Sequence, residues 1–229
     1  MAEPQRNAHP LIRRQAAADW SCASILLYGP PGVGKTTTAL SAPNPLVIDI
    51  EGGAKRWAGD SAPVRSIKEL EGLLGYLAQS DHPYDTVILD GLDTLYALVH
   101  EAMTAGSQVK DRRLGHVEPG EKLGASLRRL SLLPMLKVIT AHSREEAADK
   151  TQPTGPLRVH VALPRAFRDR VEGMVDVAAY CWRTGAQRQL VADETTQGRV
   201  TFWGKDRPGV FGAKTYPLAW KTLAGGLGL

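Results

Sequence analysis

The segment from Gly29 to Thr36 has the residue types and spacing of a phosphate-binding loop. It reads Gly-Pro-Pro-Gly-Val-Gly-Lys-Thr and matches the pattern G-x-x-x-x-G-K-[ST] at every position. Glycines let successive backbone N–H groups point at phosphate oxygens, while the lysine neutralises the β- and γ-phosphates and the final hydroxyl binds Mg²⁺. The sequence therefore predicts a site for ATP with Mg²⁺. The predicted contacts are Gly29, Pro30, Pro31, Gly32, Val33, Gly34, Lys35, Thr36 and Thr37.

A carboxylate stands where the metal-binding half of such a site is expected. Asp90 closes the apolar segment Thr86–Leu89, which has the β-branched character of a buried strand. An Asp at this place orders Mg²⁺ through its water shell. We therefore predict that Thr36 and Asp90 hold the metal, with a helix-capping role as the alternative for Asp90.

Hydrolysis needs a further carboxylate that orients and deprotonates water. Many ATPases carry a glutamate directly after the metal-binding aspartate, but Gly91 occupies that position here. Glu51 follows the apolar segment 46–50, whose end is expected at the same edge of the sheet as the phosphate loop. Glu51 is therefore the candidate base. A solvated turn residue is the alternative, and Asp93 is a weaker candidate for the same role.

Apolar runs and their periodicity predict the elements that hold these residues. The capping box that begins at Ser66 and the apolar stripe after it predict a helix from 67 to 77. The final third changes period and predicts short antiparallel strands. The sequence thus predicts an α/β fold with a mainly parallel sheet, flanking helices and antiparallel strands near the C-terminus. The expected strands are 24–28, 46–50, 86–90, 136–141, 175–182, 187–192 and 199–203.

The composition is that of an ordinary globular protein. The chain has 229 residues, of which 43% are hydrophobic and 23% charged, and its net charge of +4 permits nucleic-acid binding without establishing it. No apolar run is long enough to cross a bilayer, so we expect a cytoplasmic protein without a membrane partner. We divide the chain into an N-terminal arm (1–22), an ATPase domain (23–217) and a C-terminal tail (218–229).

The order of the motifs resembles that of RecA-like recombination ATPases. The likeness covers roughly residues 23 to 215 and is greatest to compact phage ATP-binding proteins that are implicated in single-strand annealing and recombination. It implies a RecA-like P-loop NTPase core. The motifs that carry it are the phosphate loop, Ile48-Asp49-Ile50-Glu51-Gly52-Gly53, Val87-Ile88-Leu89-Asp90, Val138-Ile139-Thr140-Ala141-His142 and Gly204-Lys205-Asp206-Arg207.

The resemblance implies roles for single residues. Glu51 matches the catalytic glutamate of the family, and His142 lies where the family has a polar residue that senses the γ-phosphate. Lys205 and Arg207 match two basic residues that reach into the ATP site of the neighbouring subunit, which implies a homo-oligomer, either a ring or a filament. A cation supplied by a neighbour would make hydrolysis depend on assembly. A solvated turn before Pro208 is the alternative.

Two loops of the family contact DNA, and both counterparts here contain basic residues. They span about 105–122 and 143–163, and their basic side chains would neutralise phosphates without reading sequence. Neither contains an aromatic residue to stack on bases, which favours annealing or loading over strand exchange. We therefore expect single-stranded DNA as partner, with a single-stranded DNA-binding protein as a further one. A nucleotide-dependent kinase or assembly factor without DNA is the alternative. The expected DNA contacts are Lys110, Arg112, Arg113, Lys122, Arg144, Lys150 and Arg158.

Overall fold

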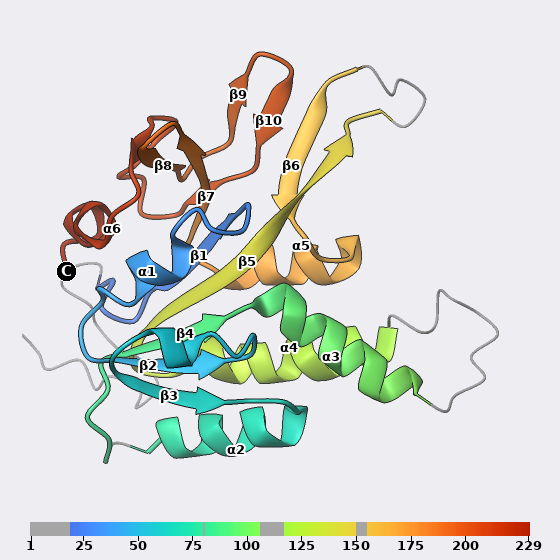
Figure 1. The fold of residues 1–229 in the computed structure, drawn as a ribbon, viewed down its shortest axis with the longest axis vertical. Helices are drawn as coiled ribbons and strands as arrows, with labels where there is room; N and C mark the ends of the chain where they lie inside the picture. The colour runs from blue at the N-terminus through green and yellow to red at the C-terminus, as the bar shows by residue number, and fades with distance from the viewer. Residues whose placement is uncertain (1–18, 80, 106–116, 150–154) are drawn as a thin grey trace, which may run out of the picture.

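The computed structural model describes residues 19–79, 81–105, 117–149 and 155–229 (Figure 1). The strands are β1 (Ser24–Gly29), β2 (Pro45–Asp49), β3 (Asp60–Pro63), β4 (Thr86–Asp90), β5 (Leu136–Ala147), β6 (Leu157–Val161), β7 (Val177–Thr184), β8 (Gln187–Val191), β9 (Thr195–Gln197), β10 (Val200–Phe202), β11 (Lys205–Asp206) and β12 (Tyr216–Pro217). The helices are α1 (Lys35–Ala39), the 3-10 turn η1 (Ala54–Arg56), α2 (Ile67–Leu77), α3 (Leu92–Thr104), α4 (Val117–Ser131), α5 (Arg165–Met174) and α6 (Trp220–Leu227).

The main sheet has the strand order β3-β2-β4-β5-β1-β7-β8-β12. From β3 to β7 the neighbouring strands run parallel, and the antiparallel pairs β7–β8 and β8–β12 follow at one side. This confirms the predicted α/β class with a mainly parallel sheet and antiparallel strands near the C-terminus. The strand β7 itself belongs to the parallel part, because it pairs with β1 before it turns into β8.

The central strands are buried on both faces, as their continuous apolar sequence predicts. Every residue of β1 is buried. Its side chains alternate between two cores, with Leu26 and Tyr28 in one and Ile25 and Leu27 in the other. The sheet is therefore the middle of three layers. The carboxyl ends of its parallel strands lie together at one edge.

The helices cover both faces of this sheet. Residues of α2, α3, α4 and α5 belong to one core, while residues of α1 and α6 belong to the other. The predicted capping box is present, because Ser66 accepts a hydrogen bond from the N–H of Glu69 and the Glu69 carboxylate accepts one from the N–H of Arg65. Among the described helices, none combines the length and the apolar character that a membrane span requires.

The strand β5 is longer than predicted. We expected it to end at Ala141 and a polar loop to follow, but it continues to Ala147 and pairs antiparallel with β6. The pairing relies on backbone hydrogen bonds, so the polar sequence Ser-Arg-Glu-Glu gives no apolar alternation by which to detect it. With β10 and β9, which pair onto β6, these strands form an arm that extends from the core (Figure 1).

Two helical segments also differ from the prediction. The helix α4 begins at Val117, three residues before the loop was expected to end at Gly120. The last residues of the chain form α6, whose Leu223 and Leu227 are buried in the same core as α1. The segment that we called a tail is thus packed on the sheet.

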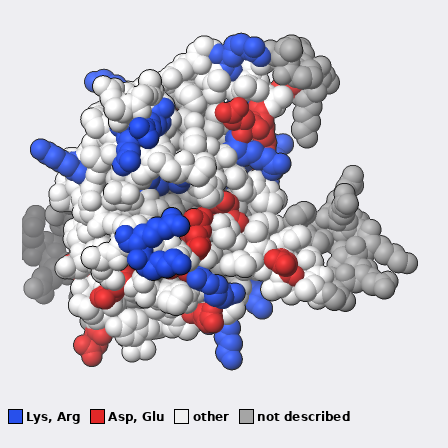
Figure 2. Space-filling view, viewed as in Figure 1, with Lys and Arg blue, Asp and Glu red and all other residues white. Residues whose placement is uncertain are grey.

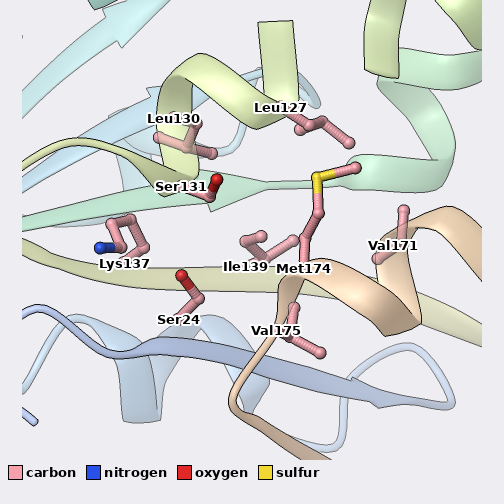
Figure 3. A pocket seen from close by; sticks show the side chains of 9 residues that line it. All are labelled: Ser24, Leu127, Leu130, Ser131, Lys137, Ile139, Val171, Met174 and Val175. Carbon is pink, nitrogen blue, oxygen red and sulfur yellow. The ribbon is translucent and has the colours of Figure 1, made fainter. Parts of the chain in front are cut away.

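A small cavity lies between α4, α5 and the sheet (Figure 3). Its volume is about 10 Å³, the size of a single water molecule, and most of its lining is apolar. The Lys137 side chain runs past it and donates hydrogen bonds to the carbonyls of Cys22 and Leu133. This cavity is a packing defect of the core and is too small for a nucleotide.

Candidate active site

The phosphate loop joins β1 to α1 at the carboxyl edge of the sheet. Gly32 and Gly34 have φ angles of 74° and 106°, which an L side chain rarely adopts. Gly29 is required for a different reason, because a β-carbon there would lie 2.0 Å from the carbonyl oxygen of Cys181 on the adjacent strand β7. The glycines therefore let the backbone curl tightly against β7 and keep its N–H groups accessible.

Lys35 is buried and held by the loop itself. Its Nζ donates hydrogen bonds to the carbonyl of Gly29 at 2.9 Å and to that of Pro30 at 2.8 Å. Burial lowers the pKa of Lys35, whereas the nearby carboxylates of Asp93 and Glu51 act in the opposite direction. The ammonium group is thus desolvated beside the loop, where a phosphate oxygen could replace one of its carbonyl partners.

Thr36 and Asp90 lie together, as the metal prediction requires. The Thr36 hydroxyl donates to Asp90 Oδ1 at 2.7 Å, and the hydroxyl of Thr140 donates to the same oxygen at 2.7 Å. Only 4% of Asp90 is exposed. A nearly buried carboxylate with hydroxyl donors next to a phosphate loop has the oxygen chemistry that suits Mg²⁺, which keeps several water ligands and binds one or two carboxylates. The residues present therefore fit the metal.

Glu51 lies across the cleft in a hydrogen-bonded group. Its Oε1 accepts a hydrogen bond from the Thr94 hydroxyl at 3.1 Å and lies 4.0 Å from His142 Nδ1. His142 in turn donates from Nδ1 to Asp93 Oδ2 at 2.8 Å, and its backbone N–H donates to Asp93 Oδ1 at 2.9 Å. Asp93 therefore positions the imidazole, whereas the Glu51 side chain, which is 37% exposed, remains accessible to water.

Gly91 explains how Glu51 reaches this place. It is the left-handed residue before α3, with a φ of 97°. A β-carbon at residue 91 would lie 2.8 Å from both Cγ and Oε1 of Glu51. Because Gly91 has no side chain, the Glu51 side chain, which follows the end of the neighbouring strand β2, has room beside it.

Residues of the phosphate loop line one cleft of about 380 Å³ together with Glu51, Asp90 and His142. Sequence reasoning gave no site role to six of its residues, namely Gly53, Arg56, Trp57, Thr140, Ala141 and Arg188. Thr140 was detectable as the polar residue of an apolar strand that adjoins Asp90, with which it is in register. Arg56, Trp57 and Arg188 come from a short turn and a hairpin, where no pattern indicates which way a side chain points. The cleft is lined by Pro31, Gly32, Gly34, Lys35, Thr36, Thr37, Glu51, Gly53, Arg56, Trp57, Asp90, Thr140, Ala141, His142 and Arg188.

Lys205 and Arg207 do not reach the cleft of their own chain. Lys205 pairs in register with Ala178 at the start of β7, and its Nζ donates to the carbonyl of Glu172. Arg207 forms an ion pair with Asp176 at 2.6 Å. Through Ala178, Lys205 is level with Leu26 in the middle of β1, and the N–H of Arg207 donates to the carbonyl of Asp176 just before β7. Both therefore lie towards the amino ends of the parallel strands, and neither lines the cleft.

The expected DNA contacts are divided between several places. Arg144 and Arg158 lie on the paired strands β5 and β6 of the arm. Lys122 lies on α4 and lines a separate groove beside α2 and α3. The remaining four predicted contacts, Lys110, Arg112, Arg113 and Lys150, fall outside the described residues.

A comparison with known protein families identifies the domain. A family model described as an AAA domain matches residues 21–208. The matched segment spans the phosphate loop, Glu51, Asp90 and His142. Because it covers most of the chain, the protein belongs to this AAA-domain family of P-loop ATPases.

Proposed function

We propose that the chain binds ATP with Mg²⁺ in this cleft and hydrolyses it, with Glu51 as the general base. The observation that carries the proposal is the position of Glu51, which lines the same cleft as the phosphate loop and whose carboxylate accepts a hydrogen bond from Thr94. A candidate base must have a fixed direction and access to water, and Glu51 has both. The Asp90 carboxylate is less suitable as a base, because it is nearly buried and already accepts hydrogen bonds from the hydroxyls of Thr36 and Thr140.

Each group of the cleft has a defined task in this reaction. Mg²⁺, when bound by Thr36 and Asp90, would neutralise charge on the β- and γ-phosphates. Lys35 would exchange a loop carbonyl for a phosphate oxygen and stabilise the negative charge that builds up there. Glu51 would take the proton of the attacking water. His142, fixed by Asp93, lies 4.0 Å from Glu51 and would sense the change in charge when the γ-phosphate leaves.

We further propose that the ATPase acts on single-stranded DNA in phage-type recombination, annealing or repair. Support comes from β5, because His142 and Arg144 lie on this one continuous strand, the first in the cleft and the second in the arm. A rigid strand could pass a displacement from the γ-phosphate to the arm. The basic side chains on the face in Figure 2 form separate groups with acidic ones beside them. Such a surface favours weak, salt-sensitive contacts to phosphates.

Assembly into a ring or filament is part of the same proposal. Lys205 and Arg207 lie far from their own cleft, so they could complete an ATP site only in a neighbouring subunit. Their present partners are a backbone carbonyl and Asp176, and the Arg207 side chain is 50% exposed. Asp176 is 17% exposed and also accepts a hydrogen bond from the N–H of Ser24. Arg207 could therefore exchange Asp176 for a phosphate without leaving this carboxylate unpartnered.

The test is ATP turnover by the wild type, Glu51→Gln and Glu145→Gln, each with and without single-stranded DNA. Glu145 is an exposed glutamate of the arm and serves as the matched control. We expect Glu51→Gln to bind ATP but to lose about 10²- to 10⁴-fold in turnover, the usual contribution of a general base. Normal turnover by this variant would move the base elsewhere.

The comparison of turnover with and without DNA separates the proposal from its alternative. We expect single-stranded DNA to stimulate turnover, and the protein to retain DNA at low salt when ATP is bound. ATP hydrolysis with neither effect would instead favour a small-molecule kinase or a nucleotide-gated assembly factor.

A further inference from the structure

One cation on the wall of the cleft has no part in the reaction described above. Arg188 lies on β8, in the β7–β8 hairpin directly opposite Arg183. Its side chain folds over the phosphate loop, since a β-carbon on Gly34 would lie 3.0 Å from Arg188 Nη1 and 3.2 Å from its Cδ. The guanidinium group is therefore next to the backbone that precedes Lys35.

The hairpin holds Arg188 at a fixed position. β8 pairs with β7 on one side and with β12 on the other, and the Arg188 carbonyl accepts a hydrogen bond from the N–H of Leu218 at 2.9 Å. Leu190 and Val191 of the same strand are buried in the two cores of the sheet. The backbone at residue 188 is thus anchored to the core, and only the side chain is free to adjust.

The guanidinium group of Arg188 forms neither an ion pair nor a hydrogen bond with the described part of the chain. Among the described residues, no carboxylate forms an ion pair with it and no acceptor forms a hydrogen bond with its guanidinium group. Arg183, by contrast, donates from Nε to the carbonyl of Gly185 and does not line the cleft. A guanidinium group folded over a phosphate loop without a counter-charge is the arrangement expected of an anion ligand, because its donors form a rigid fork that matches phosphate oxygens.

We propose that Arg188 binds the phosphate tail of the nucleotide within its own chain, beside Gly34 and Lys35. This inference rests on the proposed ATP site and adds a binding residue to it. Together with Lys35, Arg188 would let a monomer bind the phosphate tail with two cations of its own chain. Assembly would then be needed for turnover, through Lys205 and Arg207, and not for binding.

The test is calorimetric titration with a non-hydrolysable ATP analogue and Mg²⁺. We expect Arg188→Ala to bind the analogue about tenfold more weakly than the wild type, Arg188→Lys to bind with intermediate affinity, and Arg183→Ala to bind as the wild type does. Thermal unfolding of each variant shows whether the hairpin is intact. A loss of affinity in Arg188→Ala that Arg183→Ala shares equally would be a general charge effect and would overturn the proposal.

A mixing experiment tests whether Arg188 acts within its own chain. Lys35→Ala keeps Arg188 but has a defective site, so it could supply Arg188 only to a neighbour. We expect that adding Lys35→Ala to Arg188→Ala does not restore affinity, whereas restoration would refute the assignment. If the wild type binds and Arg188→Ala binds equally well, this inference fails while the proposed ATP site stands. If the folded wild type does not bind at all, the proposed function itself is wrong.

Discussion

Replacing Gly91 with alanine should displace the candidate base without touching the groups that bind nucleotide. The new β-carbon would lie 2.8 Å from Cγ of Glu51, whereas non-bonded carbon atoms prefer about 3.5–4.0 Å. Glu51 must therefore move by about 1 Å. Misplacing a catalytic group by this amount can cost about 10²-fold in rate, or about 2.7 kcal/mol of activation free energy.

The same substitution also strains the backbone, which must be separated from the effect on the base. Alanine at a positive φ costs about 1–2 kcal/mol of stability. Gly198→Ala is the matched control, because Gly198 has a φ of 60° and nothing lies within 4 Å of its added β-carbon. We expect both variants to be less stable in thermal unfolding, but only Gly91→Ala to lose turnover at saturating ATP. Its affinity for ATP should stay within about threefold of the wild type, well under the tenfold that 1.4 kcal/mol represents.

A double-mutant cycle isolates the contact itself. In the Glu51→Ala background the β-carbon at residue 91 meets no carboxylate, so Gly91→Ala should have no further effect on turnover. Wild-type turnover in the single variant Gly91→Ala would refute the reasoning that this glycine makes room for the base.

Two further predictions concern β5, namely Thr140 in the cleft and Lys137 beside the small core cavity. In Thr140→Val, Asp90 loses a hydrogen-bond donor and the buried N–H of Gly91 loses its acceptor. This variant should need a higher Mg²⁺ concentration for half-maximal turnover and lose about 1–3 kcal/mol of unfolding free energy. Thr140→Ser should restore both properties, and an unchanged Mg²⁺ dependence in Thr140→Val would argue against a metal at Asp90. Burial lowers the pKa of Lys137 below its ordinary value of 10.5, so the unfolded state binds more protons than the native state between the two values. The unfolding free energy of the wild type relative to Lys137→Met should therefore rise with pH in that window, as chemical denaturation at several alkaline pH values can show. Lys68→Met, which removes an exposed lysine, is the control for the loss of one charge. A difference that falls with pH for Lys137→Met would contradict the burial argument.

The sequence predicted the central strands and the loop well because each signal was local. The pattern around Lys35 is contiguous, and the apolar runs ending at Asp90 and Glu51 needed only the rule that parallel strands share a carboxyl edge. Thr36 and Asp90 are 54 positions apart in the chain, yet they meet at 2.7 Å. Residue types at strand ends were therefore sufficient to indicate which side chains converge.

The remaining parts of the cleft depend on tertiary contacts that leave no local pattern. The outer half of β5 is polar, so its pairing with β6 could not be distinguished from a loop. Arg188 lines the cleft because β8 pairs with β7, which in turn pairs with β1. Hydrophobic periodicity does not indicate such a strand order. Gly91 looked like a departure from the usual ATPase pattern, and only the position of Glu51 explains why a glycine is needed there.

The central claim is that the loop between β1 and α1 binds a nucleoside triphosphate with Mg²⁺. Calorimetric titration of the folded wild type and of Lys35→Ala with a non-hydrolysable ATP analogue and Mg²⁺ tests it most directly. The account predicts binding with one nucleotide per chain for the wild type and a loss of at least about 10²-fold in affinity for Lys35→Ala, which desolvated charge-assisted contacts of this kind can supply. Equal heats from both proteins, or no heat from a folded wild type, would contradict it.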